Sequence, residues 1–299
     1  MNTNQQTASR FESSALALLL RVDRIFLFRK TFVALALILA VSGTAFAQRS
    51  AGGRQKAGRN SANPVAVSKA KTIFGETKAL GDGQVRSWVS LDGRGNPTAI
   101  GLTFNESVLS NLPKEPPPGL EGTELSLALP PEAAATAFNH VRMDWNPHGH
   151  PPEKIYDVAH FDFHFYMITE EERNGITVQG EDVARSTKAP AAEFMPEGYM
   201  YVPDSAIPRM GAHWINPVSR ELHGQPFTRT LLYGSYNGNV IFVEPMIAKS
   251  FLETKTSLTE VIKLPAKYQR RAYYPTKYSV RYDPTTKEYT IALEGMTLR

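Results

Sequence analysis

Apolar and polar residues alternate along much of the chain after Lys71, a pattern typical of β-strands. Residues 83–91 and 97–104 alternate in this way on either side of the Gly-rich segment DGRGN, which predicts a β-hairpin. The same pattern predicts strands in HVRMDWNP, HFDFHFYMI, GAHWINP, FTRTLLYGSYNGNVIFVEPMI and KYSVRYDPTTKEYTIALEGM. The sequence therefore predicts a mainly β (α+β) fold with an antiparallel sheet or a barrel-like core.

Helical signals are short and few. The segments NESVLSNLP and PPEAAATAFNH each predict a short helical stretch, the second because Pro begins it and alanines follow. Thr169 precedes Glu172 by three residues in TEEERNG, which is the spacing of a capping box, and Gly175 would end that helix. We expect a few short helices beside the strands.

The N-terminal part of the chain predicts export. Arg29 and Lys30 precede an apolar run that ends in Ala45-Phe46-Ala47, so residues 1–47 are interpreted as a signal peptide with an over-long start. An uncleaved N-terminal anchor is the alternative. Residues 48–66 predict a flexible basic leader, and residues 67–299 a single β-rich domain. We therefore expect a periplasmic or extracellular protein without a stable membrane anchor after cleavage.

Charge and cysteine content narrow the function. The chain has 33 Lys and Arg against 29 Asp and Glu, but nine basic and two acidic residues lie before Ser61. The remainder has 24 basic and 27 acidic residues, and such a balance gives no support for nucleic-acid binding. With no Cys, the chain has no disulfide, no thiolate metal ligand and no cysteine nucleophile.

Histidines concentrate between residues 140 and 164, which hold five of the seven in the chain. In HFDFHFY, His160, Asp162 and His164 alternate with three phenylalanines, so a strand would place the two sets on opposite faces. The phenylalanines are expected in the core, with the polar row facing solvent or a cavity. A helix is the alternative, because residues i and i+4 are also neighbours there.

The spacing of these histidines predicts which of them could share a metal ion. Residues i and i+4 of a strand lie about 13 Å apart, so His160 and His164 reach one ion only at full stretch. The H-x-H pair His148 and His150 lies in a loop that returns the chain to His160. We therefore expect a divalent metal, zinc above others, on His148 and/or His150 with His160.

Several other residues are weaker ligand candidates. His164 and His213 are possible outside ligands, as are Glu153 and Glu244, although a lone His or Glu near a strand end is usually a hydrogen-bonded or surface residue. His140 is expected to be a cap or a surface residue. The alternative for the whole cluster is a polar strand face without metal, its histidines bonded to carboxylates.

The chain resembles a family of secreted bacterial proteins of unknown function. The resemblance rests on LGDGQVRSWVSLDGRGNPTAIGL, on DWNPHGHPP with HFDFHFY, and on MGAHWINP. The family is typified by a ring-forming protein of an extracytoplasmic sigma-factor regulon, so the resemblance implies export and a homo-oligomer but no reaction. The motif positions it carries over are His150, His160, Asp162, His164 and His213.

Two functions remain open at this point. One is an oligomeric, exported metal-binding protein associated with envelope stress, and the other is a zinc-dependent lyase or hydrolase acting on a small molecule. The sequence has no G-x-S-x-G, P-loop, H-E-x-x-H or dinucleotide-binding motif, and no acid–base partner is identified by spacing.

Overall fold

A computed structural model describes residues 69–120 and 122–299 of the chain. The predicted signal peptide and leader therefore lie outside the described residues, as do residues 67 and 68 at the beginning of the predicted domain. Within the described part, no helix has both the length and the apolar character needed to cross a membrane.

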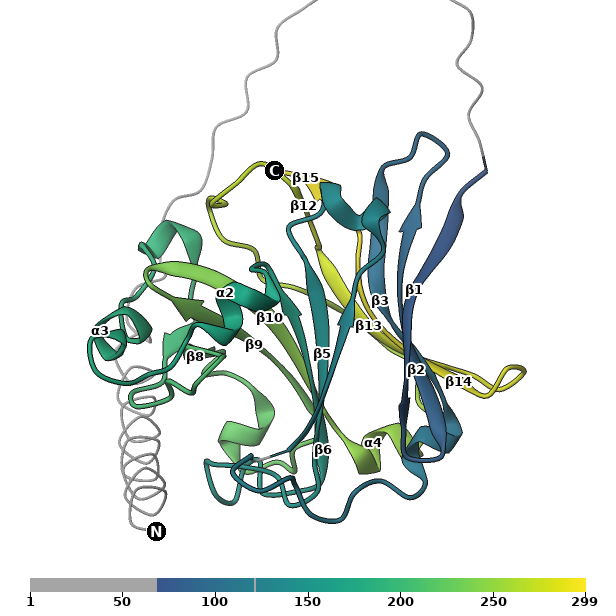
Figure 1. The fold of residues 1–299 in the computed structure, drawn as a ribbon, viewed down its shortest axis with the longest axis horizontal. Helices are drawn as coiled ribbons and strands as arrows, with labels where there is room; N and C mark the ends of the chain where they lie inside the picture. Colours follow the sequence, from purple (N-terminus) through teal and green to yellow (C-terminus); the bar gives the residue numbers. More distant parts are fainter. Residues whose placement is uncertain (1–68, 121) are drawn as a thin grey trace, which may run out of the picture.

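The fold is mainly β, as predicted, and is built on two large antiparallel sheets (Figure 1). The six-stranded sheet has the order β1 (Lys71–Leu80), β2 (Gly83–Leu91), β3 (Pro97–Asn105), β14 (Glu288–Glu294), β13 (Lys277–Asp283) and β11 (Leu258–Val261). The seven-stranded sheet has the order β4 (Thr123–Ala128), β5 (His140–Asn146), β6 (His160–Tyr166), β10 (Asn239–Ala248), β9 (Arg229–Tyr236), β8 (Ala212–Ile215) and β7 (Met200–Tyr201). A small third sheet pairs β12 (Tyr273–Tyr274) with β15 (Thr297–Leu298). Among the described residues these are open sheets, so the barrel-like alternative does not apply.

The predicted hairpins form at their turn residues. β2 and β3 pair around DGRGN, where the Asp92 carboxylate accepts hydrogen bonds from the backbone N–H groups of Arg94 and Asn96. β9 and β10 pair around Asn237 and Gly238, which both have positive φ as a tight hairpin turn requires. β13 and β14 form the third such hairpin.

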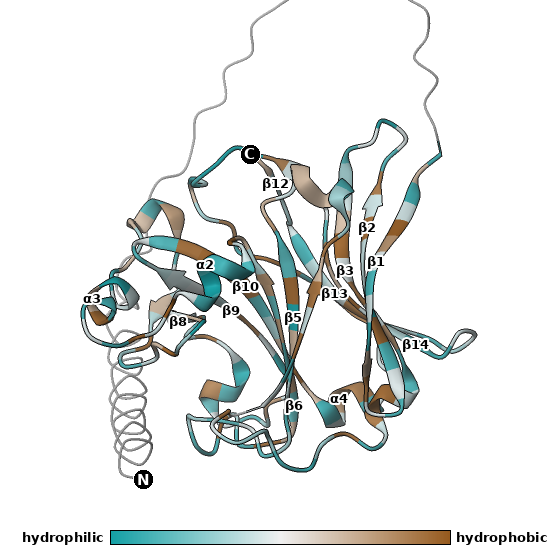
Figure 2. Cartoon of the chain, in the orientation of Figure 1, coloured by the Kyte–Doolittle hydropathy of each residue, from teal (hydrophilic) through white to brown (hydrophobic). Residues whose placement is uncertain are grey.

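The main core lies between the two large sheets. Alternate residues of β2, β3 and β14 meet the inward residues of β5 and β6, and Phe104 of β3 stacks on Phe163 of β6 with ring centroids 6.4 Å apart. Figure 2 shows hydrophobic and hydrophilic positions mixed within the strands of both sheets, as this alternation requires. The predicted burial of the three phenylalanines is confirmed, because Phe161, Phe163 and Phe165 are all fully buried.

Short helical elements join the strands. The α-helices are α2 (Glu170–Asn174), α3 (Asp182–Ser186) and α4 (Lys249–Glu253), and the 3-10 helices are η1 (Glu106–Leu109), η2 (Pro131–Ala135), η3 (Ala192–Phe194) and η4 (Arg220–His223). The capping box predicted at Thr169 and Glu172 is present at the start of α2.

The outer face of the seven-stranded sheet is covered by the chain itself. At one end of this face, Tyr156 and Phe227 pack on Leu232 and Met246. At the other end, Ile176 packs with Tyr166 and Phe242. The connections between strands within residues 147–228, which carry α2, α3, η3 and η4, supply this cover and are called the covering segment below (Figure 1). Both faces of β5 and β6 are consequently buried along their whole length.

Candidate metal centre

Neighbouring strands place a row of polar side chains on the outer face of the seven-stranded sheet. β5 and β6 pair antiparallel, with Asp144 opposite Asp162 and Arg142 opposite His164. Because side chains alternate across a strand, these residues point away from the phenylalanine core. The covering segment shields the row from bulk solvent, so ionisable groups lie side by side in a buried layer.

The first ligand group consists of His150, His160 and Asp162, whose ligand atoms all lie within 4.8 Å of one another. His160 Nε2 lies 3.1 Å from Asp162 Oδ1, and His150 Nε2 lies 3.4 Å from Asp162 Oδ2. Around a tetrahedral zinc ion with bonds of about 2.0 Å, adjacent ligand atoms are about 3.3 Å apart. The spacing of the group is therefore close to that of a zinc ligand set.

Backbone carbonyls fix the orientation of both imidazoles in this group. His160 Nδ1 donates to the carbonyl of Val158 at 2.7 Å, and His150 Nδ1 donates to the carbonyl of Pro151 at 2.8 Å. Since a carbonyl can only accept, Nδ1 carries the proton in each ring and Nε2 presents its lone pair to Asp162. Metal-ligating histidines are held in the same way, by an acceptor on the second ring nitrogen.

Asp162 is an ionised carboxylate at the centre of this group. Burial raises its pKa, but the adjacent imidazoles of His160 and His150 outweigh that effect and hold the pKa well below its usual range. Asn146 Nδ2 donates to Asp162 Oδ2 at 2.7 Å. Two buried atoms, Asp162 Oδ1 and His160 Nε2, have no hydrogen-bond partner among the described residues. An imidazole lone pair facing a carboxylate oxygen is unfavourable unless a proton or a metal ion lies between them.

The second ligand group consists of His164 on β6, His213 on β8 and Glu244 on β10, again with ligand atoms within 4.8 Å of one another. His164 Nε2 lies 3.4 Å from Glu244 Oε1, and His213 Nε2 lies 4.0 Å from Glu244 Oε2. His213 Nδ1 donates to the carbonyl of Ser205 at 2.9 Å, so its Nε2 is also the unprotonated nitrogen.

Asp144 orients His164 in the second group. Asp144 Oδ2 lies 3.1 Å from His164 Nδ1, and its Oδ1 accepts from the guanidinium of Arg142 at 2.7 Å. Burial raises the pKa of Asp144, but Arg142 and His164 lower it by a larger amount. The net result is a pKa below the usual range. Arg142 also pairs with Glu124 at 2.7 Å, which continues the charged chain towards solvent.

Burial shifts the protonation of the other two members of the second group. It lowers the pKa of His213 to about 4, so this imidazole is neutral at pH 7. It raises the pKa of Glu244 well above the usual value, and the nearby Asp162 and Asp144 charges add to the rise. A divalent cation would reverse the shift at Glu244, because it favours the ionised carboxylate.

The structure separates the histidines predicted as ligands. It brings His150 and His160 together, and it places His164 and His213 in the second group. It does not bring His148 to either group, because that side chain is 65% exposed and lies 3.1 Å from Glu115 Oε2. His160 and His164, which the spacing argument lets reach one ion only at full stretch, lie in different groups.

Three residues differ from expectation or were overlooked. His140 was expected at a cap or on the surface, and this was wrong: it is 1% exposed and stacks on Tyr166, with ring centroids 4.9 Å apart. Glu244 lies inside β10 and not at a strand end. The spacing of the histidines gives no indication of Asp144, although the alternation in HVRMDWN places it on the polar face with His140 and Arg142.

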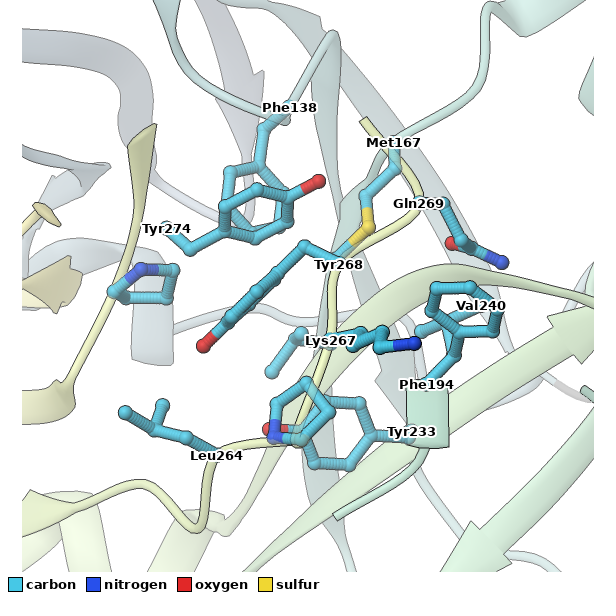
Figure 3. Close-up of a pocket in the computed structure, with 13 residues that line it drawn as sticks. Phe138, Met167, Phe194, Tyr233, Val240, Leu264, Lys267, Tyr268, Gln269 and Tyr274 are labelled. Carbon is cyan, nitrogen blue, oxygen red and sulfur yellow. The ribbon is translucent and has the colours of Figure 1, made fainter. Parts of the chain in front are cut away.

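A separate apolar pocket lies on the other side of the seven-stranded sheet (Figure 3). Aromatic side chains of Phe138, Tyr233, Tyr268 and Tyr274 line it, and its cavity volume is only about 30 Å³. Val243 lines this pocket, whereas its neighbour Glu244 points to the opposite face of β10. The pocket and the ligand groups are therefore distinct features.

Comparison with known proteins gives one partial similarity. A family model described as TTHB210-like, hypothetical protein TTHB210, matches residues 92–145. The matched stretch runs from the β2–β3 turn to Trp145 and so ends before β6 and both ligand groups. No curated protein and no solved structure matches the chain.

Proposed function

We propose that this protein binds a divalent transition metal, most readily zinc, through His150, His160 and Asp162. Two imidazoles and one carboxylate form a ligand set used by zinc enzymes and by non-haem iron sites. Three protein ligands leave a further coordination position for water or a small molecule.

One observation carries this proposal above the others. In the first ligand group, both imidazoles are fixed by backbone carbonyls so that their Nε2 atoms face one ionised, buried carboxylate. A cation placed among these three groups satisfies the buried atoms at once. A polar strand face without metal would instead require protons to be shared among them.

Elemental analysis of protein purified without a His tag, from cells supplied with zinc, tests the proposal. We expect about one metal ion per chain from this group, lost in the His150→Ala, His160→Ala double variant. His148→Ala is the matched control, because it removes the other imidazole of the H-x-H pair and should keep the metal. Unchanged metal content in a folded double variant would refute the assignment.

A lyase or hydrolase activity on a small molecule is the second candidate function. It is favoured by the partial exposure of His150, whose side chain is 21% exposed while that of His160 is fully buried. A metal ion at this position would be accessible to solvent on one side. It could then polarise the carbonyl of a substrate or activate a water molecule. Turnover of a panel of nitrophenyl esters and phosphates that is abolished by chelation and restored by zinc would support it, and metal-independent turnover would exclude it.

The proposal includes export to the periplasm or the cell exterior. It is supported by the basic residues, apolar run and Ala45-Phe46-Ala47 ending of the N-terminal segment. Fractionation of cells that express a C-terminally tagged chain should recover a shortened protein outside the cytoplasm. Full-length protein in the cytoplasm, or only in membranes, would contradict export.

Self-association is the last part of the proposal. Edge strands β1 and β11 of the six-stranded sheet expose apolar side chains, with Phe74 50% and Val261 85% exposed. Edge strands with exposed apolar residues favour contact with another copy. Light scattering should give a mass of several chains, reduced by Val261→Lys, and a monomer at all concentrations would exclude this part.

A further inference from the structure

The second ligand group has the same chemistry as the first but shares no residue with it. Each group has two imidazoles and one carboxylate within 4.8 Å of one another. His164 and Asp162 lie two positions apart on one face of β6, which corresponds to about 7 Å along a strand. The two groups are thus adjacent on one sheet face, each with its own set of ligand atoms.

We propose that His164, His213 and Glu244 form a second divalent-metal site beside the first. This inference goes beyond the proposed function, because the second site would exist whether or not the first is occupied. The ligand class it fits is a borderline cation such as zinc, cobalt or ferrous iron, which accepts imidazole and carboxylate together.

Buried atoms without partners support a ligand at this position. His164 and Glu244 are 1% and 2% exposed, yet His164 Nε2 and Glu244 Oε2 make no hydrogen bond within the described part of the chain. Each buried polar atom left in this state costs about 1–3 kcal/mol. Glu244 Oε1 lies 3.4 Å from His164 Nε2 and Oε2 lies 4.0 Å from His213 Nε2, so one cation bound among the three side chains would satisfy these atoms together.

The surroundings of the group are arranged as in known metal sites. Asp144 Oδ2 lies 3.1 Å from Nδ1 of His164, and the Ser205 carbonyl accepts from Nδ1 of His213, so in both rings Nε2 is the nitrogen that faces Glu244. A carboxylate or carbonyl on the outer nitrogen of a ligating histidine is the usual supporting arrangement. Arg142 in turn holds Asp144 through two hydrogen bonds.

The two sites should differ in how fast they exchange metal. The ligands of the second group lie on three strands of one sheet, whereas His150 of the first group lies in a loop. The second group is also less accessible, because His213 is its most exposed member at 14% and His150 reaches 21%. Release to a chelator should therefore proceed in two phases, with the slow phase from the second group.

Metal stoichiometry in matched variants tests the inference. We expect about two ions per chain in the wild type, about one in Glu244→Gln, about one in His150→Ala and none in the combined variant. Glu221→Gln is the control, since Glu221 is also a buried carboxylate but lies outside both groups. His213→Ala provides a second test at a less buried position, in case Glu244→Gln fails to fold by circular dichroism.

The outcomes separate this inference from the proposed function. One ion per chain that is lost in His150→Ala but unaffected by Glu244→Gln and His213→Ala would overturn the second site and keep the first. In that case a proton shared between Glu244 and His164 explains their proximity. One ion that is lost only in Glu244→Gln and His213→Ala would overturn the first site and support the second, and no metal in the wild type would overturn both.

Discussion

The two faces of β5 and β6 are equally buried but are built from opposite chemistry. The inner face carries Phe161, Phe163 and Phe165 and packs against the six-stranded sheet, while the outer face carries His160, Asp162 and His164. Apolar burial stabilises the fold wherever it occurs, whereas buried ionisable groups cost free energy unless they are paired or bind a cation. The outer face is therefore the one whose composition needs a functional explanation.

The covering segment is the reason that the outer face is as buried as the inner face. Without the covering segment, the polar row would be solvated, and a row of solvated histidines and carboxylates is ordinary for one face of an antiparallel sheet. Tyr156, Phe227 and Ile176 seal the layer from both ends. The chain thus buries the polar row. Burial of ionisable groups is expected for a ligand site and is unusual for a solvated surface.

Truncation on the inner face should have the largest effect on stability and none on metal. Phe163 is fully buried and packs between Phe104 and Phe161, with ring centroids 6.4 and 6.1 Å away. Phe163→Ala should lower the free energy of unfolding by about 3–5 kcal/mol, because it leaves a cavity in the core. Urea denaturation measures the loss. Reduced metal content in the folded variant would mean that the two faces are not independent.

Removing metal should have the next largest effect, and only through the outer face. Binding at free concentrations of about 100–1,000 times the dissociation constant stabilises the folded state by about 3–4 kcal/mol. Chelation of the wild type should therefore lower its melting temperature, and added zinc should restore it. The His150→Ala, His160→Ala, Glu244→Gln variant should show no response to chelator, and a full response from that variant would place the metal elsewhere.

The strand pattern could be predicted from the sequence because it depends on local alternation. HFDFHFY specifies which residues share a face, and the Gly and Asn residues of the turns specify the hairpins. The cover over the outer face could not be predicted, since it depends on contacts such as Tyr156 with Phe227 that join distant parts of the chain. Burial of His140 was missed for this reason.

The ligand groups were predictable only in part. His150 and His160 are ten residues apart and joined by one loop, so spacing alone could bring them together. The second group joins β6, β8 and β10, and their order in the sheet is not contained in local patterns. Glu244 was consequently weighed as a lone strand-end residue, although it is the carboxylate between His164 and His213.

Acid should destabilise the outer face through His140, which lies in the polar row but in neither ligand group. Burial lowers its pKa to about 4, and Arg142 and His164 lower it while Glu170 raises it. The unfolded chain, with a pKa near 6.5, binds this proton first, so the contribution is fully present above about pH 6.5 and is lost progressively as pH falls from 6.5 to about 4.

The size of this effect can be isolated in metal-free protein. The loss in the free energy of unfolding from His140 approaches about 3 kcal/mol at pH 4. The reason is that each unit of difference between the folded and unfolded pKa corresponds to about 1.36 kcal/mol. The free energy of unfolding should fall less between pH 7 and 4.5 in His140→Gln than in the wild type. Equal slopes for the two proteins would show that His140 does not titrate with an altered pKa in the folded state.

The smallest expected effect concerns Asp144, which supports the second ligand group without contacting a metal. Asp144→Asn keeps the size of the side chain but offers His164 Nδ1 a weaker acceptor, and it removes the charge that faces Arg142. Loss of such a supporting residue typically weakens metal affinity by about 10–100-fold, or about 1.4 kcal/mol and more. Competition with a chelating dye should show this weakening for the slowly exchanging ion alone. If the rapidly exchanging ion weakens equally, Asp144 acts on the whole polar layer and the two groups form one coupled centre.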